Sequence, residues 1–105
     1  MIRYKDKVFE DLFIDPETAG VTDKDGKVRH IYLHRGRREI FLDKHKVALY
    51  VIMMHTYKGY KEGLIIHHID GNKLNDSLRN LQYLTQAEHA KLHMSCRSIS
   101  EKNKT

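Results

Sequence analysis

The sequence predicts a single α+β domain, in which a strand-rich N-terminal half and one core helix pack on a C-terminal segment rich in histidine. Three observations support this class. Turn residues divide residues 13–42 into short apolar runs, apolar residues recur at helical spacing between 47 and 54, and an apolar run at 64–66 leads into paired histidines. A chain of 105 residues can bury one modest core and is too short for two.

Residues 13–42 have the pattern of a small antiparallel β meander, whereas the preceding residues are too irregular to assign. Phe13-Ile14 begins the first strand. Residues 23–26, Asp-Lys-Asp-Gly, are a turn signal because glycine tolerates positive φ, and a second turn falls at residues 35–38. The remaining strand positions are Val28, Ile31, Leu33 and residues 39–42.

A core helix is expected to follow the meander. Asp43 is a suitable N-cap, and the helix should run to about Tyr57. Its apolar stripe is formed by Val47, Tyr50, Val51 and Met54. We expect Met53 and the tyrosines of this helix in the core as well, so that the meander and the C-terminal segment pack on the helix from two sides.

A second helix is signalled by a capping box, in which the Thr85 hydroxyl and the Glu88 carboxylate each accept the other residue's backbone amide. The helix therefore begins near Gln86. His89 and His93 lie four residues apart on one of its faces, where two imidazoles can converge on one metal ion.

A third histidine ligand is available from the pair His67-His68, which ends the strand-like run 64–66. Successive side chains of a strand point to opposite faces, so one of the two can face the metal while its neighbour points elsewhere. Three protein ligands with an open position are typical of catalytic metal sites, and the remaining histidine is then free to act as a base.

The run of residues 67–72, His-His-Ile-Asp-Gly-Asn, resembles the HNH endonuclease family, and the resemblance continues through residues 75, 80–81, 89 and 93. The motif covers roughly residues 64–94. Small phage-type HNH proteins are similar in placing a strand-rich preface before it. The resemblance implies a ββα-metal fold for residues 64–96, preceded by a preface with the core helix over residues 1–60. Residues 97–105 are polar and lack apolar periodicity, so they are expected to form a frayed tail.

The resemblance also implies the roles of individual residues. His67 and His89 are expected to bind the metal, with His93 as an additional ligand, and His68 is the expected general base. Asn80 corresponds to the residue that braces the loop and so aims the base, and a backbone carbonyl of that loop is expected to fix the tautomer of His68. The resemblance further implies an endonuclease that hydrolyses phosphodiester bonds, with one divalent ion (Mg, Mn, Ni or Zn) as the expected cofactor and double-stranded DNA as the expected substrate.

The charge distribution fits a polyanionic partner. Lys and Arg number 19 against 14 Asp and Glu, which gives a net charge of +5, and residues 24–46 alone hold eight basic and three acidic residues. The turn at residues 35–38 is therefore a candidate for gripping phosphates away from the metal motif, although a solvated hairpin tip has the same composition. The residues expected to bind DNA are Arg35, Arg37, Arg38, Lys73 and Arg79.

Composition also indicates the compartment and excludes a membrane role. One cysteine, Cys96, cannot form an internal disulfide, and there is neither a secretion signal nor an apolar run of about 20 residues. We expect a cytoplasmic protein of a bacterium or a phage-infected cell, present as a monomer or weak homodimer. With one active site per chain, nicking of one strand is expected.

A non-catalytic alternative is a ββα module that binds DNA through a structural zinc ion. The presence of His68 beside His67 favours the enzyme, because a structural site needs no additional imidazole next to a ligand. Four further histidines lie outside the motif among polar neighbours and are expected on solvated faces, not at the metal: His30, His34, His45 and His55.

Overall fold

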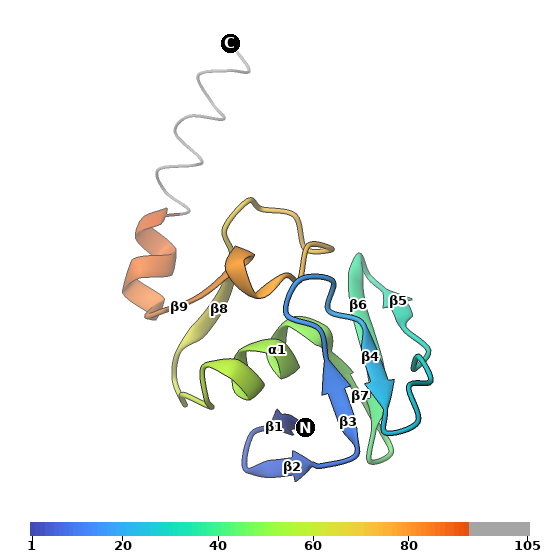
Figure 1. Cartoon of the computed structure of the whole chain (residues 1–105). Helices are drawn as coiled ribbons and strands as arrows, with labels where there is room; N and C mark the ends of the chain where they lie inside the picture. The colour runs from blue at the N-terminus through green and yellow to red at the C-terminus, as the bar shows by residue number, and fades with distance from the viewer. Residues whose placement is uncertain (93–105) are drawn as a thin grey trace.

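The computed structural model, which describes residues 1–92, confirms a mixed α+β fold built of short antiparallel strands around a central helix (Figure 1). In the N-terminal half, β1 (Ile2–Tyr4) pairs with β2 (Lys7–Phe9), and β3 (Leu12–Ile14) pairs with β4 (Val21–Asp23). A three-stranded sheet follows, with β6 (Arg37–Leu42) between β5 (Tyr32–His34) and β7 (His45–Ala48).

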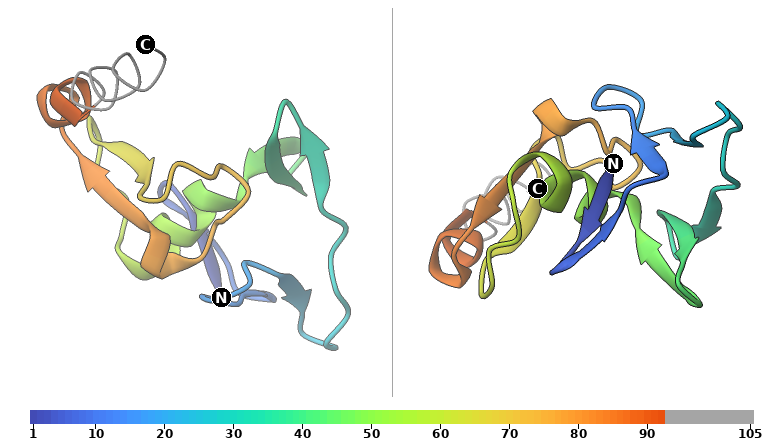
Figure 2. Two further views of the ribbon diagram at one scale, coloured as in Figure 1. Left: turned by 90° about the horizontal axis from the view of Figure 1, so that it is seen from above. Right: turned by 60° about the horizontal axis from the view of Figure 1, so that its bottom comes forward.

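The described C-terminal half contains α1 (Leu49–Tyr57), a hairpin that carries the paired histidines, and a short last helix. In this hairpin β8 (Ile65–His68) pairs with β9 (Leu81–Leu84), and the one-turn helix η1 (Leu78–Asn80) leads into β9. Figure 2 shows α1 between this hairpin and the β5–β7 sheet.

The predicted capping box is formed and starts the last described helix, residues 86–92. The Thr85 amide donates to Glu88 Oε1 at 2.9 Å, and the Glu88 amide donates to Thr85 Oγ1 at 3.1 Å. Backbone bonding continues from the His89 amide to the Thr85 carbonyl at 2.9 Å. The helix start near Gln86 is therefore confirmed.

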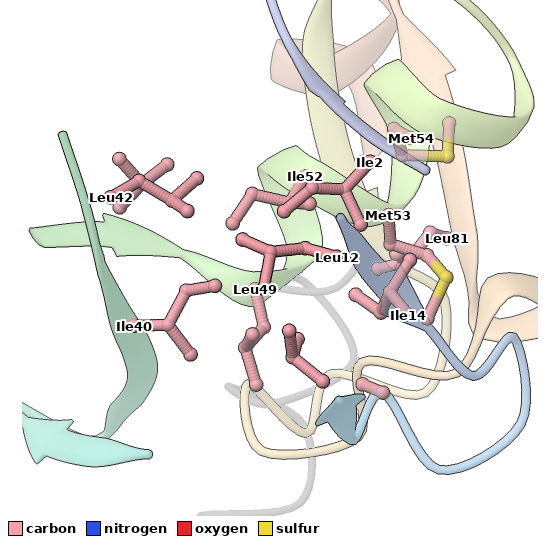
Figure 3. Close-up of a cluster of buried hydrophobic side chains, with 13 residues drawn as sticks. Ile2, Leu12, Ile14, Ile40, Leu42, Leu49, Ile52, Met53, Met54 and Leu81 are labelled. Carbon is pink, nitrogen blue, oxygen red and sulfur yellow. The ribbon is translucent and has the colours of Figure 1, made fainter. Parts of the chain in front are cut away.

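One hydrophobic core joins the two halves of the molecule, as Figure 3 shows. The central helix contributes Leu49, Ile52, Met53 and Met54, all essentially inaccessible to solvent. Residues from β1, β3, β6 and β9 pack against them: Ile2, Leu12, Ile14, Ile40, Leu42 and Leu81. The expectation for the methionines is confirmed, whereas the ring of Tyr57 is 44% exposed and only its hydroxyl is anchored, to the Ile14 carbonyl at 2.6 Å.

The prediction that Asp43 caps the core helix is wrong. Asp43 and Lys44, with φ of 46° and 74°, form the tight turn between β6 and β7. The Asp43 carboxylate forms an ion pair with Lys7, and the hydrogen bond and charge of Lys7 lower the pKa of Asp43. The N-cap is Ala48 and the helix begins at Leu49, five residues later than proposed. Val47 is buried on a strand opposite Ile40, so an apolar position that fits a helical stripe is here satisfied by strand pairing.

The meander is more divided than predicted. Residues left unassigned form the β1–β2 hairpin, and β3–β4 is a sheet separate from β5–β7. The turn at residues 23–26 is confirmed: Gly26 has a φ of 83°, and its backbone amide donates a hydrogen bond to the Asp23 carbonyl at 3.0 Å. Beyond it, an isolated bridge joins Thr22 and Val28, and the Val28 side chain is exposed.

His55 lies inside the molecule, in contrast to the solvated position expected. Its Nδ1 accepts the Lys5 amide at 2.9 Å, and its ring packs on Tyr4 and Tyr60 with centroid separations of 5.8 and 4.9 Å. Burial, and secondarily the charge of Lys5, lower the pKa of His55. The lowered pKa favours the neutral imidazole, and these contacts tie the end of β1 to α1.

Two sequence predictions fall on residues 93–105, outside the described part of the chain: His93 as a ligand and the frayed tail at residues 97–105. Cys96 lies outside it as well. Within residues 1–92, no helix has the length and apolar character needed to cross a membrane.

Candidate active site

The loop between β8 and β9 is held by the side chain of Asn80, which is buried. Its Nδ2 donates to Asp70 Oδ1 and to the Asn75 carbonyl, both at 2.9 Å, while its Oδ1 accepts the Asp70 amide at 3.0 Å. Asp70 also accepts hydrogen bonds from the Asn75 side chain and the Asn72 amide, and these bonds lower the pKa of its carboxyl. Both carboxylate oxygens of Asp70 therefore accept hydrogen bonds within the loop.

The two histidines of β8 meet different neighbours, as the alternation of a strand requires. His67 faces the last helix, where the ring of His89 lies 5.8 Å away between centroids. His68 packs against Tyr50 of α1, edge to face, at 4.9 Å. The strand thus gives one imidazole to the helix and the other to the core.

His68 is buried and hydrogen-bonded to a carboxylate that the sequence analysis did not single out. Its Nε2 donates to Asp76 Oδ1 at 2.8 Å, where a backbone carbonyl was expected. The second oxygen of Asp76 pairs with Arg38 Nε at 3.2 Å. In the sequence, Asp76 resembles any other polar residue of the loop. Its position eight residues after the predicted base was the one feature that could have suggested a contact with His68.

Both histidines of β8 border an open cleft of about 340 Å³. Two residues predicted to bind DNA, Arg37 and Lys73, lie on its wall. The Arg37 guanidinium stands 5.7 Å from the centroid of the Tyr50 ring and donates to its hydroxyl at 3.4 Å. The lining is completed by Tyr50, Ile65, Ile66, His67, His68, Gly71 and His89. Cationic side chains and imidazoles therefore face one space.

The arginines of the 35–38 segment do not form one surface, and the expectation that they lie away from the metal motif is wrong. Arg35 is exposed in the β5–β6 turn, Arg37 reaches the cleft, and Arg38 is half-buried in its ion pair with Asp76. Arg37 and Arg38 are neighbours on β6, so their side chains are directed to opposite sides of the strand. Arg35 lies on the Arg37 side, where the two border a second hollow together with Lys73. Arg79 is exposed, 3.4 Å from Glu17.

The donors that the cleft offers suit a divalent metal ion. His67 and His89 are imidazoles, which bind Zn, Ni and related ions, and metal–nitrogen bonds of about 2.0–2.1 Å allow rings at this separation to reach one ion. Among residues 1–92 no group of three potential ligands is assembled. The predicted third ligand, His93, lies outside this range.

Comparison with known proteins relates this chain to one family of nucleases. Residues 48–91, from the end of β7 into the last helix, match the family model described as HNH endonuclease. The DNA endonuclease I-HmuI of Bacillus phage SP01 is 36% identical over 72 residues, which are 69% of this chain and 38% of that protein.

A solved structure, described as DNA binding and cleavage by the HNH homing endonuclease I-HmuI, shares the fold with a TM-score of 0.73 at 23% identity. The match covers 97% of this chain and 64% of that one. The present chain is therefore similar to part of a larger enzyme. HNH nucleases generally use a divalent metal ion.

Proposed function

Because residues 48–91 make this chain a member of the HNH endonuclease family, we propose that it hydrolyses phosphodiester bonds of double-stranded DNA with one divalent metal ion. One observation carries the proposal. The cleft that holds the imidazoles of His67 and His89 is also bordered by His68, whose hydrogen bond goes to Asp76 and not to the other histidines. Metal ligands and a separate base are what this reaction needs.

In the proposed reaction His68 takes a proton from water, and the water oxygen forms a bond to phosphorus. The bond from phosphorus to the 3′ oxygen breaks in line with the attack, which leaves a 5′-phosphate and a 3′-hydroxyl once the departing oxygen is protonated from solvent. A bound divalent ion supplies Lewis-acid stabilisation of the charge on the phosphate and the departing oxygen. His67 and His89, with His93 as the expected third ligand, would hold this ion.

Asn80 supports the site indirectly. Its three hydrogen bonds fix both ends of the loop that follows His68, and the Ile69 amide donates to the Asn80 carbonyl at 2.7 Å. His68 is therefore attached to a loop that these hydrogen bonds hold in place. A fixed position of the base matters because small displacements of a catalytic group lower the reaction rate.

The proposed DNA contacts divide into two groups. Arg37 and Lys73 border the cleft and are suited to phosphates beside the cleaved bond. Arg35 and Arg79 are exposed and can bind the backbone farther away, which gives affinity without sequence preference. Arg38 is withdrawn from this set because its guanidinium is engaged with Asp76.

We expect a single chain to nick one strand, since residues 1–92 form one cleft of this kind. A structural zinc module remains the alternative, but the anchored His68 has no function in it. The test uses protein freed of metal and supplied in turn with Mg²⁺, Mn²⁺, Ni²⁺ or Zn²⁺, with supercoiled plasmid as substrate. Relaxation to nicked circles with at least one ion supports the proposal. A protein that binds the plasmid and leaves it supercoiled with every ion refutes it.

A further inference from the structure

A buried acid links the proposed base to the N-terminal half of the chain. Asp76 is 1% exposed, and each of its carboxylate oxygens has a different partner. Oδ1 accepts from His68 Nε2 at 2.8 Å, and Oδ2 accepts from Arg38 Nε at 3.2 Å. Burying a carboxylate costs free energy unless hydrogen-bond donors and an opposite charge surround it, and Asp76 has both.

We propose that Asp76 is a positioning residue that sets the tautomer and orientation of His68, and that Arg38 locks Asp76 in place. The inference rests on the proposed function, because it concerns the base of that reaction. It reassigns Arg38 from a DNA contact to part of the machinery that holds the base.

The tautomer follows from the acceptor. An ionised carboxylate can accept hydrogen bonds and cannot donate them, so the hydrogen of the neutral imidazole must be on Nε2. Nδ1 then carries the lone pair, and no residue in the described part of the chain forms a hydrogen bond with it. This is the nitrogen left to take a proton from water. The edge-to-face contact with Tyr50 limits rotation of the ring.

The lock on Asp76 is supplied by segments far away in the sequence. Arg38, from β6, donates through Nη2 to the Thr18 carbonyl at 3.2 Å while Nε holds Asp76. The Thr18 turn is itself fixed, because Asp15 Oδ1 accepts the Thr18 amide at 3.2 Å. The planar guanidinium presents its donors at fixed angles, so it prevents the carboxylate from turning away from His68.

The same N-terminal turn holds the chain next to Asp76. The Leu78 amide donates to the Pro16 carbonyl at 2.7 Å, and Ser77 Oγ donates to the same oxygen at 3.4 Å. The backbone on the C-terminal side of Asp76 and the side chain of Asp76 are thus both tied to residues 15–20 and β6.

The decisive variant is Asp76→Asn, which keeps the size of the side chain. Its single oxygen faces Arg38, because the guanidinium cannot donate to an amide NH₂, and the NH₂ group then faces His68 Nε2. The hydrogen is forced onto Nδ1. We expect kcat at saturating DNA to fall by between about 10-fold and 10⁴-fold, with KM for DNA nearly unchanged.

The tautomer is read directly by ¹⁵N NMR of the His68 ring in metal-free protein, well above the ordinary histidine pKa of about 6.5. Wild type should show the hydrogen on Nε2, and Asp76→Asn should show it on Nδ1. This readout does not depend on cleavage, so it separates the inference from the proposed function.

Arg38 supplies the second pair of variants. Arg38→Met should lower kcat by roughly 10-fold or more, and Arg38→Lys should recover part of the loss because an ammonium can still reach Asp76 Oδ2. Arg29→Met is the matched control: Arg29 Nη2 also donates to a backbone carbonyl, that of Phe41 at 3.2 Å, with no link to His68. Its kcat at saturating DNA should equal that of wild type.

Two results overturn the inference: a wild-type His68 with its hydrogen on Nδ1, or an Asp76→Asn protein that keeps both the wild-type tautomer and kcat. If Asp76→Asn does not fold, the wild-type spectrum and the Arg38 variants decide. If wild-type protein never cleaves DNA, the proposed function fails, and the NMR result still establishes whether Asp76 holds His68.

Discussion

The β8–β9 hairpin and the strand-rich N-terminal half are organised in different ways. The hairpin loop is fixed by bonds between residues close in sequence, as in the Asn80 to Asp70 and Asn75 contacts. The N-terminal half consists of strands of three to six residues in separate small sheets, which depend on packing against α1. A local motif can therefore be recognised in the sequence, whereas its supports come from pairings that leave little trace there.

The two regions share one hydrophobic core, so a cavity in that core should destabilise both regions together. Met53→Ala removes a fully buried side chain of α1 and should lower the free energy of unfolding by about 2–5 kcal/mol. Urea denaturation followed by circular dichroism measures the change. The matched control Leu33→Ala, at a residue 70% exposed, should change it by less than about 0.5 kcal/mol. Two separate transitions would contradict the shared core.

A smaller loss is expected from the loop itself. Asn80→Ala leaves the Asp70 amide and the Asn75 carbonyl without their partner and should cost about 1–3 kcal/mol. Asn72→Ala is the control, because the Asn72 side chain accepts one exposed bond, from the Leu74 amide at 3.0 Å. Equal stabilities of the two variants in the same denaturation assay would show that Asn80 does not brace the loop.

The smallest effect concerns pH and the N-terminal half. Burial lowers the pKa of His55 in the folded state, so the unfolded chain takes up this proton first as the pH falls. Stability from the neutral His55 is thus complete above the unfolded pKa of about 6.5 and is lost progressively below it. Compared with wild type, His55→Gln should lose less stability between pH about 7 and about 5. Parallel curves for the two proteins would exclude this role.

Contacts between residues close in the sequence could be predicted, whereas contacts between distant residues could not. Thr85 and Glu88 are three residues apart, so their capping box could be predicted, and His67 with His68 could be identified by their position at a strand end. The helix start was misplaced at Asp43 because an apolar position such as Val47 fits a strand equally well.

Contacts across long separations could not be predicted. Asp76 and Arg38 are 38 residues apart, and each resembles an ordinary polar surface residue until the fold joins them. The same holds for Arg37, which reaches the cleft only because β6 is adjacent to α1 in space. Residues that bind directly to a substrate or ion were therefore easier to propose than those that hold them.

The central claim is that neighbouring histidines have different tasks, with His67 holding the metal ion and His68 activating water. The most direct measurement is single-turnover plasmid cleavage by folded His68→Ala, with metal affinity determined by calorimetry on the same sample and His67→Ala as the matched comparison. We predict that His68→Ala keeps its metal affinity and cleaves about 10² to 10⁴ times more slowly, whereas His67→Ala loses the metal. Loss of metal by His68→Ala, or undiminished cleavage, would contradict the account.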